Sequence, residues 1–291
     1  MSPATCHLSP TAGQLRERSL LRSGADGNSR SYLERSEFMT STAESLLSDI
    51  QRIAPDIAAR ATEIETGRDI PTDLVETLRS VGVFRLLVPR SHGGLELELP
   101  VAAEVIAALA KIEGSVGWIA MIADVTQLLA ALLPRETYDQ IYRNGPDVIF
   151  AGSNQPAGTA EATSGGWRVG GRWPFASGSR HANWIIGYCV MMKDGAPLAG
   201  PVAGASLMQG FFMPAHHWQI EDTWYVAGLK GTGSPAKRIA YDFICIALIR
   251  AVLRSRACNS GLRDLQLVAY RLGSFALRFS RSHSCNLSGW S

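Results

Sequence analysis

Long apolar runs, a signal sequence and paired cysteines are all missing from this sequence. Its most hydrophobic stretch, Trp118 to Leu133, is interrupted by Asp124 and Gln127 and is too short for a membrane span, so we expect a buried helix there. The first residues do not show a positively charged segment followed by an apolar segment and a small-residue cleavage site, the pattern of a signal peptide. This argues against secretion. Five scattered cysteines without a Cys-x-x-Cys spacing predict neither a metal site nor a disulfide framework, and therefore a reduced, cytoplasmic protein.

A large net charge is also missing. The chain carries +2 over 291 residues, so its charge indicates neither a nucleic-acid partner nor a membrane surface. The charges are unevenly distributed, because residues 237–291 hold nine basic and two acidic residues whereas residues 39–236 hold 14 basic and 20 acidic ones. We therefore expect a mildly acidic globular part between two ends of different composition.

The spacing of apolar residues changes near Gly145. Before this point apolar residues recur at helical spacing, and after it short runs alternate between apolar and polar residues. This succession predicts an α+β fold, with an all-α helical domain at residues 39–146 followed by an antiparallel, barrel-like β domain at residues 147–234. Gly114 and Gly117 are expected to bracket a break between two helices. The expected helices span roughly residues 43–66, 71–82, 100–112, 117–133 and 135–143.

The two ends of the chain are expected to lie outside this fold. Residues 1–38 are rich in Ser, Arg and Gly, lack apolar periodicity and predict a disordered extension. In residues 235–291 Arg and Cys increase and acids almost vanish, and Pro235 interrupts a strand pattern. We interpret this tail as foreign to the fold and produced by a shifted reading frame. The alternative is a basic amphipathic helix for a membrane or nucleic acid.

The stretch 165–178 predicts a β-hairpin that leads aromatic and hydroxyl side chains onto an exposed turn. We expect the reversal at Gly170–Gly171, followed by Trp173, Phe175 and Ser177. An aromatic face packs against a planar cofactor, and a hydroxyl or backbone N–H bonds the heteroatoms of its ring. The pattern therefore favours a flavin-like cofactor, although a serine followed by glycine is also ordinary turn chemistry.

Other aromatic and histidine residues have simpler interpretations. Trp167 and Trp184 are expected in the core of the sheet, whereas Trp173 fits the core and a ligand site equally well. His181 is a candidate hydrogen-bond donor at the site. His92 lies in a glycine-rich turn and is predicted to be solvated.

Three motifs occur in an order and spacing that are typical of a known family. They are Leu87-Val-Pro-Arg-Ser-His-Gly-Gly-Leu95, Phe150-Ala-Gly-Ser-Asn-Gln-Pro156 and Gly171-Arg-Trp-Pro-Phe-Ala-Ser-Gly178. Over about residues 43–234 the chain resembles the acyl-CoA dehydrogenase superfamily. Within it, the Trp-x-Phe-x-Ser-Gly stretch and the run from Gly228 to Ser234 look most like the flavin-dependent, two-component monooxygenase branch.

The resemblance implies a bound flavin, either FAD or FMN. It places Ser153 near the edge of the flavin ring, Phe175 beside the ring, Ser177 near its reactive side, and Trp118 facing the flavin or the substrate. It also implies hydroxylation of an aromatic or heteroaromatic small molecule with O2, using reduced flavin from a partner reductase. Neither nucleic acid nor a membrane is implied as a partner.

Two other functions stay open. The chain could be a true acyl-CoA dehydrogenase that oxidises an acyl-CoA thioester with FAD, or a non-catalytic binding protein that acts through its basic tail. Members of the superfamily also carry a carboxy-terminal helical domain that supplies the catalytic base and builds a homo-oligomer. Nothing in residues 235–291 resembles it, so we assign no catalytic residue, expect an incomplete active site and do not extend the homo-oligomer to this chain.

Overall fold

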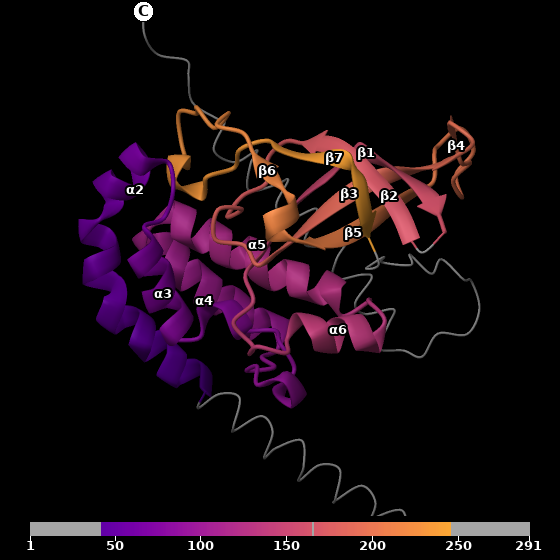
Figure 1. Cartoon of the computed structure of the whole chain (residues 1–291). Coiled ribbons are helices and arrows are strands. Elements are labelled where there is room, and N and C mark those ends of the chain that lie inside the picture. Colours follow the sequence, from indigo (N-terminus) through magenta and orange to yellow (C-terminus); the bar gives the residue numbers. More distant parts are fainter. Residues whose placement is uncertain (1–41, 165, 246–291) are drawn as a thin grey trace, which may run out of the picture.

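The computed structural model describes residues 42–164 and 166–245 as a layer of helices packed beside a layer of strands (Figure 1). Helix α5 (Gly114–Ala130) contacts both layers, because it packs on α4 on one side and on the first strand of the sheet on the other. The predictions for residues 1–38 and 246–291 fall outside the described residues. Within the described part, no helix is long and apolar enough to cross a membrane.

The helical layer follows the apolar spacing of the sequence. The predicted helix at 43–66 is broken at Arg60, and α2 ends at Arg68, whose φ is +55°. Pro71 immediately precedes α3, and Pro100 lies in the first turn of α4, where its missing N–H costs no helical hydrogen bond. The helices are residues 42–59, α2 (Ala61–Gly67), α3 (Thr72–Ser80), α4 (Leu99–Ile112), α5 and α6 (Arg135–Ile141).

The junction between α4 and α5 is shorter than expected. Glu113 alone separates the two helices, and its carboxylate accepts the Val116 N–H at 2.8 Å as the N-cap of α5. Gly117 lies inside α5, so the expectation that it bounds a break was wrong. A Cβ at Gly117 would lie 2.5 Å from the Ala110 Cα, and glycine is therefore used there for close helix packing.

The two polar residues that interrupt the apolar run of α5 are buried, as expected for a buried helix. Asp124 Oδ1 accepts the Leu86 N–H at 3.2 Å, and Gln127 Nε2 donates to the Phe84 carbonyl at 2.7 Å. Burial raises the pKa of Asp124 well above its ordinary value. Both side chains therefore fix α5 against the turn that follows α3, instead of marking an exposed helix face.

Within the described residues the sheet has seven strands. They are β1 (Phe150–Thr163), β2 (Gly166–Trp173), β3 (Trp184–Lys193), β4 (Ala196–Pro197), β5 (Met208–Pro214), β6 (Gln219–Ile220) and β7 (Lys237–Cys245). Their order is β4-β3-β1-β2-β7-β6, and β5 pairs with β3. The α+β class predicted from the sequence is confirmed.

Two details of the sheet differ from the prediction. Strands β1 and β3 run parallel, so the sheet is mixed instead of wholly antiparallel, and its described strands do not close into a barrel. The reason is the connection after β2. Residues 174–183 cross to the other side of β1 before β3 begins. Strand β3 therefore lies beside β1 and runs in the same direction.

Gly170–Gly171 is not the reversal of a hairpin. Both residues lie inside β2, which pairs with β1 along its length and with β7 through a register shift between Val169 and Gly171. A Cβ at Gly171 would lie 2.5 Å from the Gly158 Cα on β1. These glycines therefore allow close approach of two strands, a use that a sequence pattern does not distinguish from a turn.

Strand β7 lies within the segment that we predicted to be foreign to the fold. Residues 237–245 pair with both β2 and β6 (Figure 1). The interpretation that the fold ends at residue 234 was therefore wrong for residues 237–245: Ile239 is buried among the sheet residues despite the basic composition around it. The remainder of the tail, residues 246–291, is outside the described residues.

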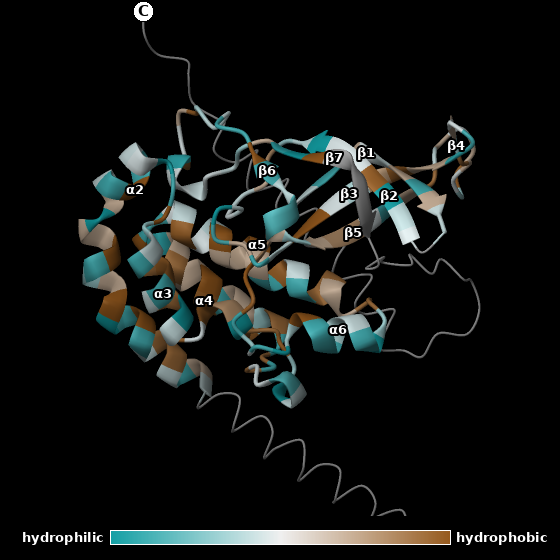
Figure 2. Ribbon diagram, viewed as in Figure 1, coloured by the Kyte–Doolittle hydropathy of each residue, from teal (hydrophilic) through white to brown (hydrophobic). Residues whose placement is uncertain are grey.

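Buried apolar side chains form two clusters. One lies among the helices and includes Ile57, Leu74 and Val105, and the other lies on the sheet and includes Phe150 and Phe211. Figure 2 shows hydrophobic segments concentrated on α4 and α5, where the helices meet. Helix α5 therefore carries its side chains to the boundary between the two clusters, where the candidate site lies.

Candidate functional site

The first two turns of α5 bring an indole ring to the sheet domain. Trp118 Nε1 donates a hydrogen bond to Ser177 Oγ at 3.0 Å, across 59 residues of sequence. Ser177 belongs to the turn Phe175–His181, called here the 175–181 turn, which lies in the connection between β2 and β3. Two of the four residues that the resemblance placed at a flavin are therefore in direct contact.

A chain of hydroxyl groups continues from this contact. Ser177 Oγ lies 2.5 Å from Ser234 Oγ, which lies 3.0 Å from Thr232 Oγ1, and Thr232 donates to the Leu229 carbonyl. All three hydroxyl-bearing residues are buried. We call Ser177, Ser234 and Thr232 the hydroxyl chain. The sequence analysis missed Ser234 and Thr232 as site residues, although the run from Gly228 to Ser234 had contributed to the family resemblance.

Phe175 stands at the rim of the same turn. Its side chain is 58% exposed and its φ is +59°, a backbone conformation that costs a bulky residue about 1 kcal/mol or more. Its ring lies nearly perpendicular to the Trp224 ring, at a centroid distance of 6.3 Å. The turn therefore holds an aromatic face open to solvent, two residues from the hydroxyl that contacts Trp118.

Gly178 fixes the turn against its neighbours. Its φ of +70° suits glycine, and its N–H donates to the Thr232 carbonyl at 2.9 Å. A Cβ at this position would lie 3.1 Å from Ile119 Cγ2 on α5. The turn is therefore packed between α5 and the loop Leu229–Ser234, called here the 229–234 loop.

Ser153 is not joined to this group in the described part of the chain. It is buried on β1, where its Oγ accepts the Gln155 N–H at a long 3.4 Å, next to the register shift between Ser153 and Gly158. The structure thus brings Trp118 and Ser177 together with Phe175 at the rim, and leaves Ser153 on a neighbouring strand without a direct contact to them.

Two aromatic residues with simpler interpretations belong to the core. Trp173 is 1% exposed, donates from Nε1 to the Tyr188 carbonyl at 2.8 Å, and packs edge-on against Trp218. Trp167 packs against Phe211 at a centroid distance of 5.9 Å. The choice left open for Trp173 is therefore resolved in favour of the core.

The expectation that His92 is solvated was wrong. Its side chain is only 11% exposed, and Nε2 lies 2.8 Å from Asp139 Oδ1. Its ring also packs edge-on against Tyr138 and Tyr142 of the α6 segment. Nothing in the sequence indicated that His92 is packed in this way, because its partners follow more than 40 residues later.

A buried lysine lies beside the 175–181 turn. Lys237 of β7 has no exposed surface, and its Nζ donates to the Ser179 carbonyl at 3.1 Å. Burial, together with the positive charge of Arg180, lowers the pKa of the Lys237 ammonium from 10.5 to about 7. Ser179 Oγ is buried without a hydrogen-bond partner within the described residues. The sequence analysis missed both residues, since it assigned Lys237 to a foreign tail.

These features fit a planar ring with polar edges. Phe175 offers an exposed aromatic face, Trp118 and Ser177 offer a polar edge, and the unpartnered Ser179 Oγ offers one more hydrogen-bonding group. No cluster of three His, Cys, Asp or Glu side chains able to hold a metal occurs in the described residues. The donor set therefore suits a flavin and gives no support to a metal.

The family comparison supports the same interpretation. Residues 40–134 match the family model described as acyl-CoA dehydrogenase, N-terminal domain. These residues are similar to an acyl-CoA dehydrogenase amino-terminal domain. The resemblance to this superfamily predicted from sequence motifs is thereby confirmed, and the domain includes α5 with Trp118.

The chain is also similar to flavin-dependent monooxygenases. It is 33% identical over 192 residues to the oxygenase subunit HsaA of Mycobacterium tuberculosis, covering 66% of the chain and 47% of that protein. It is 38% identical over 176 residues to an indole-3-acetate monooxygenase of Pseudomonas putida, covering 60% and 43%. The chain therefore spans about half the length of these curated relatives.

Solved structures agree with the fold. The crystal structure of HsaA from M. tuberculosis superposes with a TM-score of 0.64 at 32% identity, covering 70% of this chain and 51% of that one. XiaF from Streptomyces sp., solved with FADH2 and glycerol, superposes with a TM-score of 0.67 at 29% identity, covering 73% and 52%. The described residues thus have the acyl-CoA dehydrogenase-like fold.

Proposed function

We propose that this chain is the flavin-binding part of a monooxygenase that hydroxylates an aromatic or heteroaromatic small molecule. The contact between Trp118 and Ser177, with the exposed ring of Phe175 beside it, is the observation that supports the proposal. The similarity to HsaA and to an indole-3-acetate monooxygenase supports the reaction class. FAD and FMN are both proposed as cofactors, and XiaF, which was solved with FADH2, is a structural relative that bears a flavin.

Each site residue has a proposed role. Phe175 packs beside the flavin ring and excludes water from it, while Ser177 bonds a polar atom of the ring. Trp118 donates to Ser177 and so directs the Ser177 proton toward either Ser234 or a ligand. Ser153 stays a proposed cofactor contact. A reduced flavin, when bound, supplies the electrons for the activation of O2.

Proposed partners follow from the reaction class. A separate flavin reductase would supply reduced flavin, and the substrate would be a small molecule instead of nucleic acid or a membrane lipid. The cytoplasm is the proposed location, since reduced flavin and reduced thiols are both compatible with it. The boundary predicted between the helical and β domains, near residue 146, is kept as part of the proposal, whereas the end predicted at residue 234 is moved to include β7.

An acyl-CoA dehydrogenase is the second candidate, because residues 40–134 match the amino-terminal domain of that family. Such an enzyme would retain oxidised FAD and reduce it on addition of an acyl-CoA thioester. We expect instead that reduced FMN or FAD binds more tightly than the oxidised form. Anaerobic titration of the full chain with both redox states, followed by addition of acyl-CoA, distinguishes the two. Reduction of bound FAD by acyl-CoA overturns the monooxygenase proposal.

Substitution of Trp118 by phenylalanine is expected to weaken binding of reduced flavin about fivefold to tenfold, because Ser177 then loses the donor that orients it. Fluorescence titration under anaerobic conditions measures the dissociation constant. Trp167→Phe is the matched control, since Trp167 packs on Phe211 in the sheet core. Equal dissociation constants for the Trp118 and Trp167 variants would contradict the assigned role of Trp118.

A further inference from the structure

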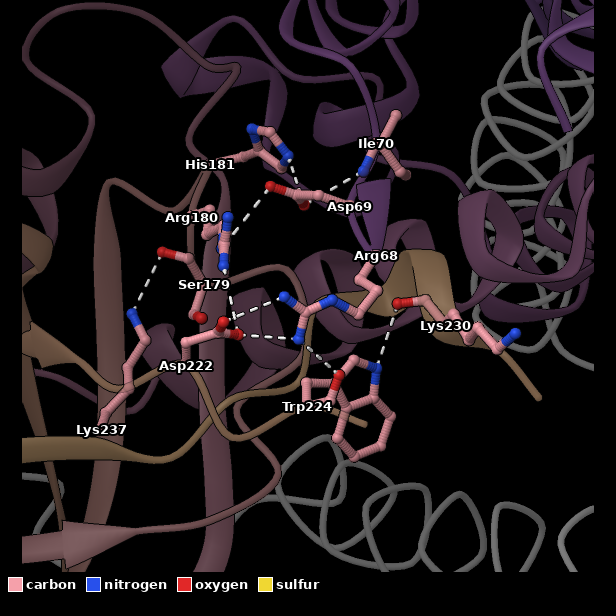
Figure 3. Close-up of polar contacts among 10 residues, drawn as sticks. All are labelled: Arg68, Asp69, Ile70, Ser179, Arg180, His181, Asp222, Trp224, Lys230 and Lys237. Carbon is pink, nitrogen blue, oxygen red and sulfur yellow. Dashed lines mark hydrogen bonds and ion pairs between the residues drawn. The ribbon is translucent and has the colours of Figure 1, made fainter. Parts of the chain in front are cut away.

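A network of charged side chains joins the loop between α2 and α3 to the 175–181 turn (Figure 3). Asp69 is its centre. Its Oδ1 lies 3.0 Å from His181 Nε2 and accepts the Ile70 N–H at 3.0 Å, while its Oδ2 lies 3.8 Å from Arg180 Nε. Asp69 and His181 are only 19% and 8% exposed, so water screens this pair less than a surface ion pair.

Asp69 also lies close to the 229–234 loop. Gly233 has a φ of +46°, and a Cβ added there would lie 3.1 Å from Asp69 Oδ1, so only a residue without a side chain fits beside the carboxylate. The neighbours of Gly233 are Thr232 and Ser234, two of the three members of the hydroxyl chain. The carboxylate therefore binds the 175–181 turn through His181 and lies beside the 229–234 loop, and these two segments meet at the Ser177–Ser234 contact.

The residue before Asp69 binds the next loop of the sheet domain. Arg68 donates through both terminal nitrogens to Asp222, at 2.8 and 3.0 Å, and through Nη1 to the Trp224 carbonyl at 3.0 Å. Arg180 lies 4.0 Å from the same Asp222 carboxylate (Figure 3). The turn that ends α2 thus presents a cation and an anion side by side: Arg68 binds Asp222, and Asp69 binds His181 of the 175–181 turn.

We infer that Asp69 is a positioning residue that holds His181 so that Ser177 stays in contact with Trp118. Gly178 N–H to Thr232, Ala176 N–H to Pro235 and the Lys237 ammonium to Ser179 bind the 175–181 turn to the sheet domain. The Asp69 carboxylate instead binds the carboxyl end of the turn to the helical layer, the layer that carries Trp118. The consequence for flavin binding rests on the proposed function, whereas the placement of Ser177 does not.

The test follows the indole N–H of Trp118 by NMR in the full chain without flavin, with the signal assigned from Trp118→Phe. In Asp69→Ala we expect hydrogen exchange of Trp118 Nε1–H to become about tenfold faster, because the bond to Ser177 opens more often. Asp73→Ala is the matched control, since Asp73 pairs with Arg60 on the same helical hairpin, away from the turn. Equal exchange rates in the Asp69 and Asp73 variants overturn the inference.

A second pair of variants covers the case in which Asp69→Ala fails to fold. His181→Leu removes the donor to Asp69, whereas His181→Gln keeps an amide donor near the same place. We expect faster exchange of the Trp118 indole in the leucine variant and a rate near wild type in the glutamine variant. Wild-type rates in both overturn the inference. Failure of the wild-type chain to bind reduced flavin counts against the proposed function alone, because the exchange experiment contains no flavin.

Discussion

Replacement of Lys237 by methionine is expected to raise the free energy of unfolding by about 3 kcal/mol at pH 7. The ammonium has no exposed surface, and its single hydrogen bond goes to the Ser179 carbonyl. Its pKa falls from 10.5 to about 7, with burial as the larger cause and the charge of Arg180 as the smaller. Methionine fills a similar volume and carries no charge that must be desolvated, so the folded state becomes more stable relative to the unfolded state.

The effect on pH dependence has a definite sign. Between pH 7 and 10.5 the unfolded chain binds a proton at Lys237 that the folded chain has lost, so the stability of the wild type rises with pH across this window. Below pH 7 both states are protonated and the cost of the buried charge is present in full. The methionine variant should lack this rise, so its advantage over the wild type disappears by about pH 10.5.

Chemical denaturation between pH 6.5 and 10 measures both effects. Arg238→Met is the matched control, since Arg238 is the next residue on β7 but lies exposed and pairs with Glu221. Its stability change should be small and independent of pH over this range. A Lys237→Met variant that is less stable than the wild type at pH 7 would show that Lys237 gains more from a partner than it loses by burial.

Truncation of Trp173 to alanine is expected to cost about 4 kcal/mol of folding free energy. The Trp173 indole is buried against Gly158 of β1 and Gly187 of β3, and truncation would leave a large cavity and an unpaired Tyr188 carbonyl. Trp173→Phe should cost less, about 1–2 kcal/mol, because it keeps most of the packing and loses the hydrogen bond. Urea denaturation of each variant provides the values.

Phe175→Gly is the informative partner for these variants, because Phe175 lies two residues away and faces solvent. Glycine adopts a φ of +59° without strain, so we expect the free energy of unfolding to stay within about 1 kcal/mol of wild type. The same change should weaken binding of reduced flavin, whereas Trp173→Phe should not. If Phe175→Gly unfolds the protein while flavin binding depends on Trp173, the assignment of core and site is reversed.

Much of the helical layer could be predicted from the sequence. Apolar spacing and the placement of Pro71 and Pro100 located α3 and α4, because helix hydrogen bonds and caps are local and leave a local pattern. The exceptions have a tertiary cause. Gly117 lies inside α5 because another helix approaches there, and close approach between helices leaves no mark on the spacing of one of them.

The sequence predicted that this part of the chain forms strands, but it did not predict how the strands pair. Alternating residues after Gly145 predicted a region of strands, whereas the parallel pairing of β1 with β3 depends on the path of residues 174–183. The basic composition after Pro235 suggested that no strand follows, yet β7 forms there. Pairing is decided by the neighbouring strand as well as by the segment itself, so composition misled at β7.

The sequence by itself determined the class of fold, the family resemblance and the motif that carries Phe175 and Ser177. It could do so because these depend on local periodicity and on residue order. Only the tertiary structure decided that Ser177 meets Trp118 and Ser234, that Lys237 is buried, and that Asp69 lies beside His181 and Gly233. These residues lie about 60 to 160 positions apart in the sequence, and the packing of the helical layer and the loops on the sheet brings them together.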